Sequence, residues 1–205
     1  MKTALHLGIF LSLIASGSAY SGEPSGKCGG MEKLGPPAFD GISLTRSRCN
    51  YVSTEQVTKP GFGPAPYRSI TFFYELPANG RADIMIGDMR KNLADPGLAM
   101  VRTMIQSTKS QRKAIESTVK AGIAGEAKVL KDFDEGARVM NLLTAEDSVV
   151  SYSDGDGSLM AVVSGNISVL THFPAKNMDD AIRVSKQLFT SINFNLINSS
   201  AIDPL

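Results

Sequence analysis

The chain has 205 residues, and its 21 basic and 20 acidic side chains leave a formal net charge of +1. A chain of this length can bury a core of its own and fits one domain. A charge so close to zero gives no reason to expect nucleic acid as a partner.

The first nineteen residues have the pattern of a secretory signal peptide. Lys2 supplies a small positive charge, residues 4–15 form an apolar run too short to span a bilayer, and residues 17–19 are small, as at a cleavage site. We therefore predict a signal peptide over residues 1–19. The mature chain is expected in the periplasm or secreted, with no transmembrane segment.

Both cysteines, Cys28 and Cys49, lie near the start of the mature chain. An even number of cysteines in an exported protein favours a disulfide, and two free thiols are the alternative. The bridge would tether an irregular Gly/Pro-rich leader and the first strands, residues 20–68, at the edge of the domain. The main core is expected over residues 69–194, followed by a frayed tail over residues 195–205.

A stiff loop at residues 59–68 contains three prolines and two glycines, which exclude a helix or a central strand. Phe62 and Tyr67 would form a recognition surface if they point outward from this loop. The alternative, which we favour, is that both aromatic rings fold back onto the core.

Strands are indicated by alternation of apolar and polar residues and by the turn residues between them. We predict short strands at 42–48 and 51–57, and a hairpin of residues 69–76 with 81–89. Residues 136–173 should form a meander at the centre of the sheet, because Asp154-Gly155-Asp156-Gly157 and Ser164-Gly165-Asn166 are turn sequences.

Two helices have clear start signals. Asp95 and Pro96 predict the start of the first helix, which is interrupted by a polar stretch at 106–111 and ends near Gly122 or Gly125. Asn177 is the predicted N-cap of the closing helix, and seven residues between Met178 and Ile192 form its apolar stripe. The predicted fold class is α+β: an antiparallel β-sheet of about six or seven strands with two main α-helices packed on one face.

Most catalytic arrangements lack the necessary residues. After signal removal His172 is the one remaining histidine, it is expected on a strand facing the same way as Ser168 and Leu170, and no G-x-S-x-G motif accompanies it. Zinc needs several His or Cys ligands, and the spacing after Asp154 does not match a calcium-binding EF-hand loop. No nucleotide-binding motif is present, so no metal or other cofactor is predicted.

Two further groups of charged residues are candidate sites. Asp83 and Asp88 near the ends of one strand, with Glu75 on the neighbouring strand, could form the paired carboxylates of a hydrolase. On the first helix the basic residues Arg102, Lys109, Lys113 and Lys120 share one side. This basic strip could bind anionic lipid, cell-wall polymer or an acidic protein, although we favour an ordinary solvated helix face.

The favoured functional hypothesis is an exported, non-enzymatic protein that binds another protein or an envelope component, as an accessory protein or an inhibitor. The alternative is a carrier of a small apolar ligand, with methionines lining a space between sheet and helices. Its candidate methionines are Met100, Met104, Met140, Met160 and Met178. A hydrolase with a carboxylate-based site is the third hypothesis.

Overall fold

The computed structural model describes residues 28–39, 42–52, 67–75, 81–90, 96–142, 145–163, 166–197 and 202. Its strands are β1 (Ala38–Phe39), β2 (Ile42–Val52), β3 (Tyr67–Glu75), β4 (Arg81–Asp88), β5 (Ala137–Met140), β6 (Ala145–Ser153), β7 (Asp156–Val163) and β8 (Ile167–Pro174). Its helices are α2 (Pro96–Lys120), α3 (Glu126–Gly136) and α4 (Met178–Ser191), with the short 3-10 helices η2 (Met31–Lys33) and η5 (Phe194–Leu196). The predicted signal peptide lies outside the described residues.

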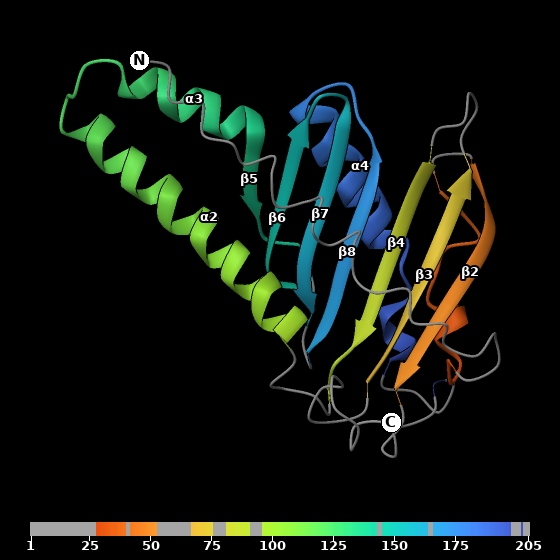
Figure 1. Cartoon of the computed structure of the whole chain (residues 1–205). Helices are drawn as coiled ribbons and strands as arrows, with labels where there is room; N and C mark the ends of the chain where they lie inside the picture. The colour runs from red at the N-terminus through yellow and green to blue at the C-terminus, as the bar shows by residue number, and fades with distance from the viewer. Residues whose placement is uncertain are drawn as a thin grey trace.

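The strands form one antiparallel sheet in the order β1-β2-β3-β4-β8-β7-β6-β5 (Figure 1). Two meanders, β1 to β4 and β5 to β8, are joined where β4 pairs with β8. Because β1 pairs over only two residues, seven strands make up the body of the sheet. The predicted α+β class and strand number are confirmed.

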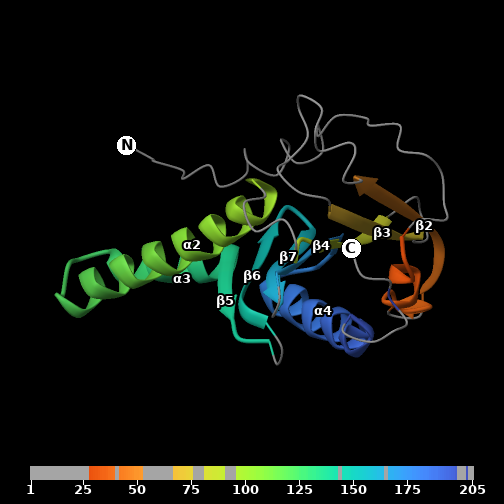
Figure 2. The same cartoon turned by 90° about the horizontal axis from the view of Figure 1, so that it is seen from below.

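The two main helices lie on opposite faces of the sheet, so the prediction that both pack on one face is wrong (Figure 2). Leu98, Val101 and Ile105 of α2 pack with Val149, Met160 and Val162. Residues one position away, Val150, Leu159 and Ala161, pack with α4 instead. Every residue of β7 from Gly157 to Val163 is buried, because one helix covers each of its faces.

Local signals place the turn at Asp154 and the cap at Asn177 as predicted, whereas the predicted cap Asp95 and residues 164–165 lie outside the described residues. Asp154 (φ 50°) and Gly155 (φ 92°) form the two-residue turn between β6 and β7, where both backbones must be left-handed. The Asn177 side chain accepts a hydrogen bond from the Asp180 N–H at 2.9 Å and caps α4. Asn166 (φ 64°) occupies the turn before β8.

Two predicted interruptions are absent. The predicted break after residue 48 is absent, because β2 runs from Ile42 to Val52 and is irregular between Leu44 and Arg46, while residues 53–57 of the second predicted strand lie outside the described residues. The first helix is not divided at residues 106–111, because α2 runs unbroken to Lys120. The intrinsic helix propensities of the polar residues at 106–111 allow them to stay within one continuous helix.

The helix α3 was not predicted from the sequence. It begins after Gly125 (φ 89°), which provides no side-chain cap, and it contains no buried residue. Together with the second half of α2 it forms a hairpin that projects past β5 from the edge of the sheet (Figures 1 and 2). None of the helices in the described ranges is long and apolar enough to cross a membrane.

The segment that starts at Cys28 belongs to the core, and its predicted place at the edge of the domain is wrong. Met31 and Leu34 are each 1% exposed and pack with the α4 side of the sheet. The Tyr74 hydroxyl donates to the Pro36 carbonyl oxygen at 2.8 Å, and the Asn193 N–H donates to the Leu34 carbonyl oxygen at 3.1 Å. These contacts fix an irregular segment whose composition alone indicates a loose leader.

The end of the chain also differs from the expected frayed tail. Ile197 is 7% exposed and Ile202 is 5% exposed, and both belong to the same core cluster as Leu34. Apolar side chains at these two positions therefore belong to the packed core, and residues 198–201 and 203–205 lie outside the described residues.

Cys28 and Cys49 form the predicted disulfide, with Cα atoms 5.7 Å apart. The Cys28 sulfur lies 3.7 Å from the Ser69 carbonyl oxygen, and because a disulfide sulfur has no proton this is a packing contact. The bridge joins the buried N-terminal segment to β2, opposite Ile70 of β3. It therefore reinforces the core beside β3.

We expect thiol titration of the denatured, unreduced protein to find no free thiol. Reduction should lower the free energy of unfolding by about 3 kcal/mol, because the bridge closes a loop of roughly twenty residues. Denaturant titrations with and without reductant measure this difference. A titratable thiol in the unreduced protein would contradict the pairing.

Candidate functional site

Six side chains line up across six neighbouring strands on the face of the sheet that carries α2. Arg46 pairs with Phe73, Phe73 with Asp83, and Asp83 with His172. The row continues from His172 to Ser158 and from Ser158 to Ser151. Residues directly opposite in register share a face, so these residues, here called the register row, lie side by side although the sequence separates them widely.

Phe73 lies between two guanidinium groups. The Arg46 guanidinium carbon is 4.5 Å from the centroid of the Phe73 ring, and that of Arg81 is 4.4 Å away. Both distances suit cation–π contacts. Arg81 also lies 3.8 Å from Asp83, whereas Arg46 has no carboxylate partner among the described residues. Arg46 is exposed.

His172 lies next to two carboxylates. Its Nε2 is 3.5 Å from a carboxylate oxygen of Asp156, and Asp83 is its register partner on β4. Burial raises the pKa of Asp83, while the nearby charges of His172 and Arg81 act in the opposite direction. His172 faces the same way as Ser168 and Leu170, as predicted, and its side chain is 42% exposed.

The register row brings a serine, a histidine and an aspartate together, which the sequence did not indicate. Ser158 is only 7% exposed, and its hydroxyl is hydrogen-bonded to that of Ser151 at 2.6 Å. Within the described residues no hydrogen bond joins Ser158 to His172. β7 is paired on both sides, so its backbone N–H groups are not arranged as an oxyanion hole. The geometry therefore differs from that of a nucleophilic triad.

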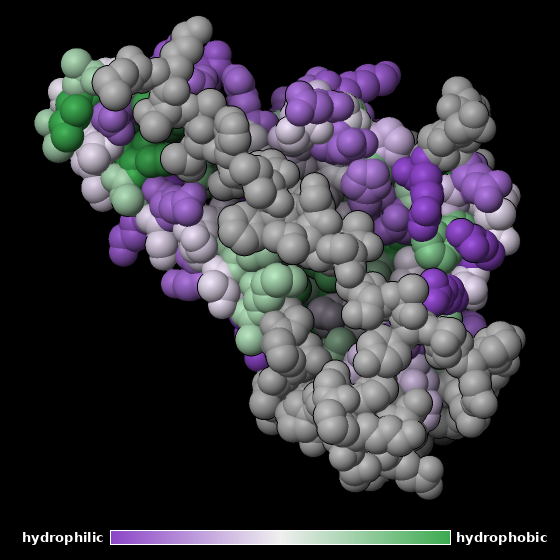
Figure 3. All heavy atoms as spheres, in the orientation of Figure 1, coloured by the Kyte–Doolittle hydropathy of each residue, from purple (hydrophilic) through white to green (hydrophobic). Residues whose placement is uncertain are grey.

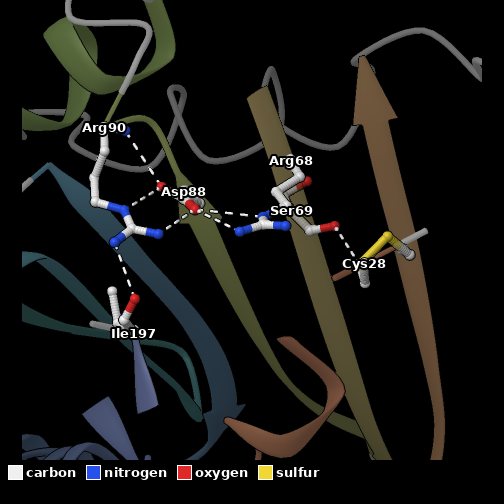
Figure 4. A network of polar contacts seen from close by, with 7 residues as sticks. Cys28, Arg68, Ser69, Asp88, Arg90 and Ile197 are labelled. Atoms are coloured by element: carbon white, nitrogen blue, oxygen red, sulfur yellow. Dashed lines mark hydrogen bonds and ion pairs between the residues drawn. A yellow bond between two sulfur atoms is a disulfide. The ribbon is translucent and has the colours of Figure 1, made fainter. Parts of the chain in front are cut away.

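Asp88 is the centre of a buried charge network at the other end of β4 (Figure 4). It is 1% exposed and accepts hydrogen bonds from Arg68 at 3.2 Å and from the Arg90 side chain at 2.8 and 2.9 Å. Arg90 also donates to the Ile197 carbonyl oxygen at 2.9 Å. Burial alone would raise the pKa of Asp88, but the hydrogen bonds and charge of Arg90, with the charge of Arg68, hold it below its usual value.

This network has a structural role, because it attaches the residues after α4 to the sheet. Asp83 and Asp88 are five positions apart on one strand and so lie on opposite faces. They cannot flank one substrate bond, so the structure does not bring these two acids together as the paired carboxylates considered for a hydrolase. Glu75 is exposed at the end of β3, opposite Arg81.

The predicted binding residues are not all available for binding. Arg102 donates a hydrogen bond to the Asn166 side chain, and Lys109 is half-buried and has a partner. Lys113 and Lys120 are exposed. Tyr67 is half-buried as the first residue of β3, and Phe62 lies outside the described residues.

The five methionines considered for a carrier pocket do not line one space. Met160 and Met104 pack on the α2 side of the sheet, Met178 and Met140 on the α4 side, and Met100 is 41% exposed. Among the described residues no group of three or more His, Cys, Asp or Glu side chains could hold a metal ion.

Comparison of the chain with protein-family models, curated proteins and solved structures finds no match. Evidence on function therefore comes from the arrangement of this chain's own residues. The described helices leave the β2–β3–β4 part of the α2 face uncovered, and the Arg46–Phe73–Arg81 cluster lies there (Figures 1 and 2).

Proposed function

We propose that this is an exported, non-enzymatic binding protein that recognises a carboxylate side chain on the surface of a partner protein. Binding uses the Arg46–Phe73–Arg81 cluster on the α2 face of the sheet. The observation that carries this proposal is the placement of Phe73 between two guanidinium groups, one of which has no carboxylate partner in the described structure.

The cluster has the chemistry of residues that dominate binding energy in protein interfaces. Arginine is enriched at such positions, and aromatic rings supply large contact areas. The guanidinium of Arg46 is planar and binds a carboxylate through two parallel hydrogen bonds. Its contact with Phe73 holds it in place before binding, which reduces the side-chain entropy lost in the complex.

Charges beside the cluster favour a protein over a polyanionic envelope polymer. The acidic side chains of Asp83 and Asp156 lie in or next to the register row, so this face carries negative as well as positive charges. A polymer with closely spaced negative groups would be repelled by these carboxylates. A partner that places a single carboxylate at Arg46 avoids this repulsion and fits the surface better.

Capture from an envelope extract, followed by affinity measurement with the purified partner, tests this function. We expect Arg46→Glu to weaken binding by roughly tenfold or more, because loss of an interface anchor costs on the order of 2 kcal/mol. Lys186→Glu is the matched control, since Lys186 is exposed on α4 at the opposite face and the charge change is the same.

Thermal unfolding followed by circular dichroism checks that both variants keep the fold. Equal weakening by the two substitutions would reject the proposed surface, because a general charge effect would then explain the result. Stronger binding to purified anionic cell-wall polymer than to any captured protein would reject a protein as the partner.

A further inference from the structure

The α2–α3 hairpin carries apolar side chains that the rest of the described chain does not cover. No residue between positions 106 and 136 is buried, although a helix of a folded domain normally hides one apolar stripe. Ile123 is 53% exposed and Val129 is 45% exposed. The half-buried apolar residues of the hairpin are Ile115, Val119, Leu130 and Phe133. Apolar surface at the projecting end of the hairpin is visible in Figure 3.

Polar contacts between the two helices fix the hairpin as a unit. Arg112 of α2 donates hydrogen bonds to both carboxylate oxygens of Asp134 in α3, at 2.8 and 3.1 Å. Near the loop, the Thr118 hydroxyl donates to Glu126 at 2.8 Å. The hairpin can therefore present its uncovered apolar residues in a fixed arrangement.

The two helices of the hairpin carry opposite net charges. In α2 from residue 106 to residue 120 there are four basic residues and one acidic residue, a net charge of +3. In α3 there are four acidic residues and two basic ones, a net charge of −2. Lys113 and Lys120 on α2, and Asp132 and Glu135 on α3, are exposed members of the two sets.

We propose that the α2–α3 hairpin binds the same hairpin of a second copy of this chain, forming a four-helix bundle between two protomers. A two-fold axis would place α2 of each protomer against α3 of the other. Each contact between the protomers would then join the basic helix α2 of one copy to the acidic helix α3 of the other. The apolar residues that a two-helix hairpin leaves uncovered would fill the centre of the bundle.

The charges favour a second copy over an anionic membrane surface. The lysines of α2 would attract lipid headgroups, but the exposed acids of α3 lie on the same projecting hairpin and would be repelled by them. In a dimer those acids face lysines of the other protomer. The part of α2 beyond the sheet is about 22 Å long, which suffices for several turns of contact.

Two charge-reversed variants of the mature protein test the pairing. The acidic variant carries Lys113→Glu and Lys120→Glu, which changes the net charge of this part of α2 from +3 to −1. The basic variant carries Asp132→Lys and Glu135→Lys, which changes the net charge of α3 from −2 to +2. All four positions are exposed, so both variants should fold. Their thermal unfolding curves check this.

Sedimentation equilibrium should give twice the monomer mass for the wild type at high concentration. Each variant alone should associate at least about tenfold more weakly, because like charges replace several ion pairs. An equimolar mixture should regain the dimer mass, since each altered helix then meets one of opposite charge. Regained association identifies contact between α2 and α3 of different copies.

Three results would overturn the inference. One is a wild-type protein that stays monomeric at high concentration, and another is a pair of variants that dimerise as tightly as the wild type. The third is a mixture that fails to associate although each folded variant is monomeric. A monomer that cosediments with phosphatidylglycerol vesicles would instead identify the hairpin as a membrane-binding element.

Discussion

Replacing Asp88 by alanine is expected to lower the free energy of unfolding by about 3 to 5 kcal/mol, the usual cost of removing one partner from a buried ion pair. The substitution takes away the carboxylate that both Arg68 and Arg90 contact, while Arg68 stays 2% exposed. It also releases the group that positions Arg90 against the Ile197 carbonyl. Urea titration of the variant and the wild type measures the loss.

Asp83→Ala is the matched control on the same strand. Asp83 lies 3.8 Å from Arg81, whose side chain is 53% exposed, and such pairs contribute less than about 1 kcal/mol. A large loss at position 83 and a small loss at position 88 would contradict the structural role of the buried network.

Leu34→Ala should destabilise the protein by about 2 to 5 kcal/mol, as expected when a fully buried leucine is truncated and leaves a cavity. Leu34 is 1% exposed and packs in the same cluster as Phe72 and Ile197. Its backbone carbonyl, which accepts the Asn193 N–H, is not changed by the substitution. Thermal and denaturant unfolding both measure the effect.

Lys33→Ala is the control in the neighbouring residue, because the Lys33 side chain is exposed. Its effect should stay within about 0.5 kcal/mol. Equal and small effects at positions 33 and 34 would mean that the N-terminal segment is peripheral, as its Gly/Pro-rich composition indicates.

The features that the sequence predicted correctly depend on neighbouring residues. The Asp154-Gly155 turn requires left-handed backbone at two consecutive positions, and the residue types alone indicate it. The cap at Asn177 and the apolar stripe of α4 are equally local. The hairpin of β3 and β4 follows from alternation on either side of a turn sequence.

The faces covered by the helices could not be predicted in this way. β7 is buried on both of its faces, so its sequence does not alternate between apolar and polar residues. Such a strand does not indicate which face a given helix covers. The sequence also gives little indication of α3, since Gly125 provides no capping side chain and none of the helix residues is buried. Met31 and Leu34 are buried by strands and a helix distant in the sequence.

The candidate binding surface was missed for a related reason. Arg46, Phe73 and Arg81 come from three strands, and only the register between those strands brings them together. The β3–β4 hairpin was predicted, but the sequence specified neither the pairing of β2 with β3 nor the register that aligns these three residues. By contrast, the basic strip on α2 is visible in the sequence because helical spacing is local, yet two of its four members have partners.

The pairing of β4 with β8 has a consequence for the order of folding. Asp83 and His172 are 89 positions apart, whereas consecutive strands within each meander are joined by connections of at most 14 residues. Closing the long loop between β4 and β8 loses chain entropy before the contacts of that pair can repay it. We therefore expect each meander to collapse on its own first. The pairing of β4 with β8 forms last. In a partly folded chain both of these strands therefore have an unpaired edge that another molecule could bind.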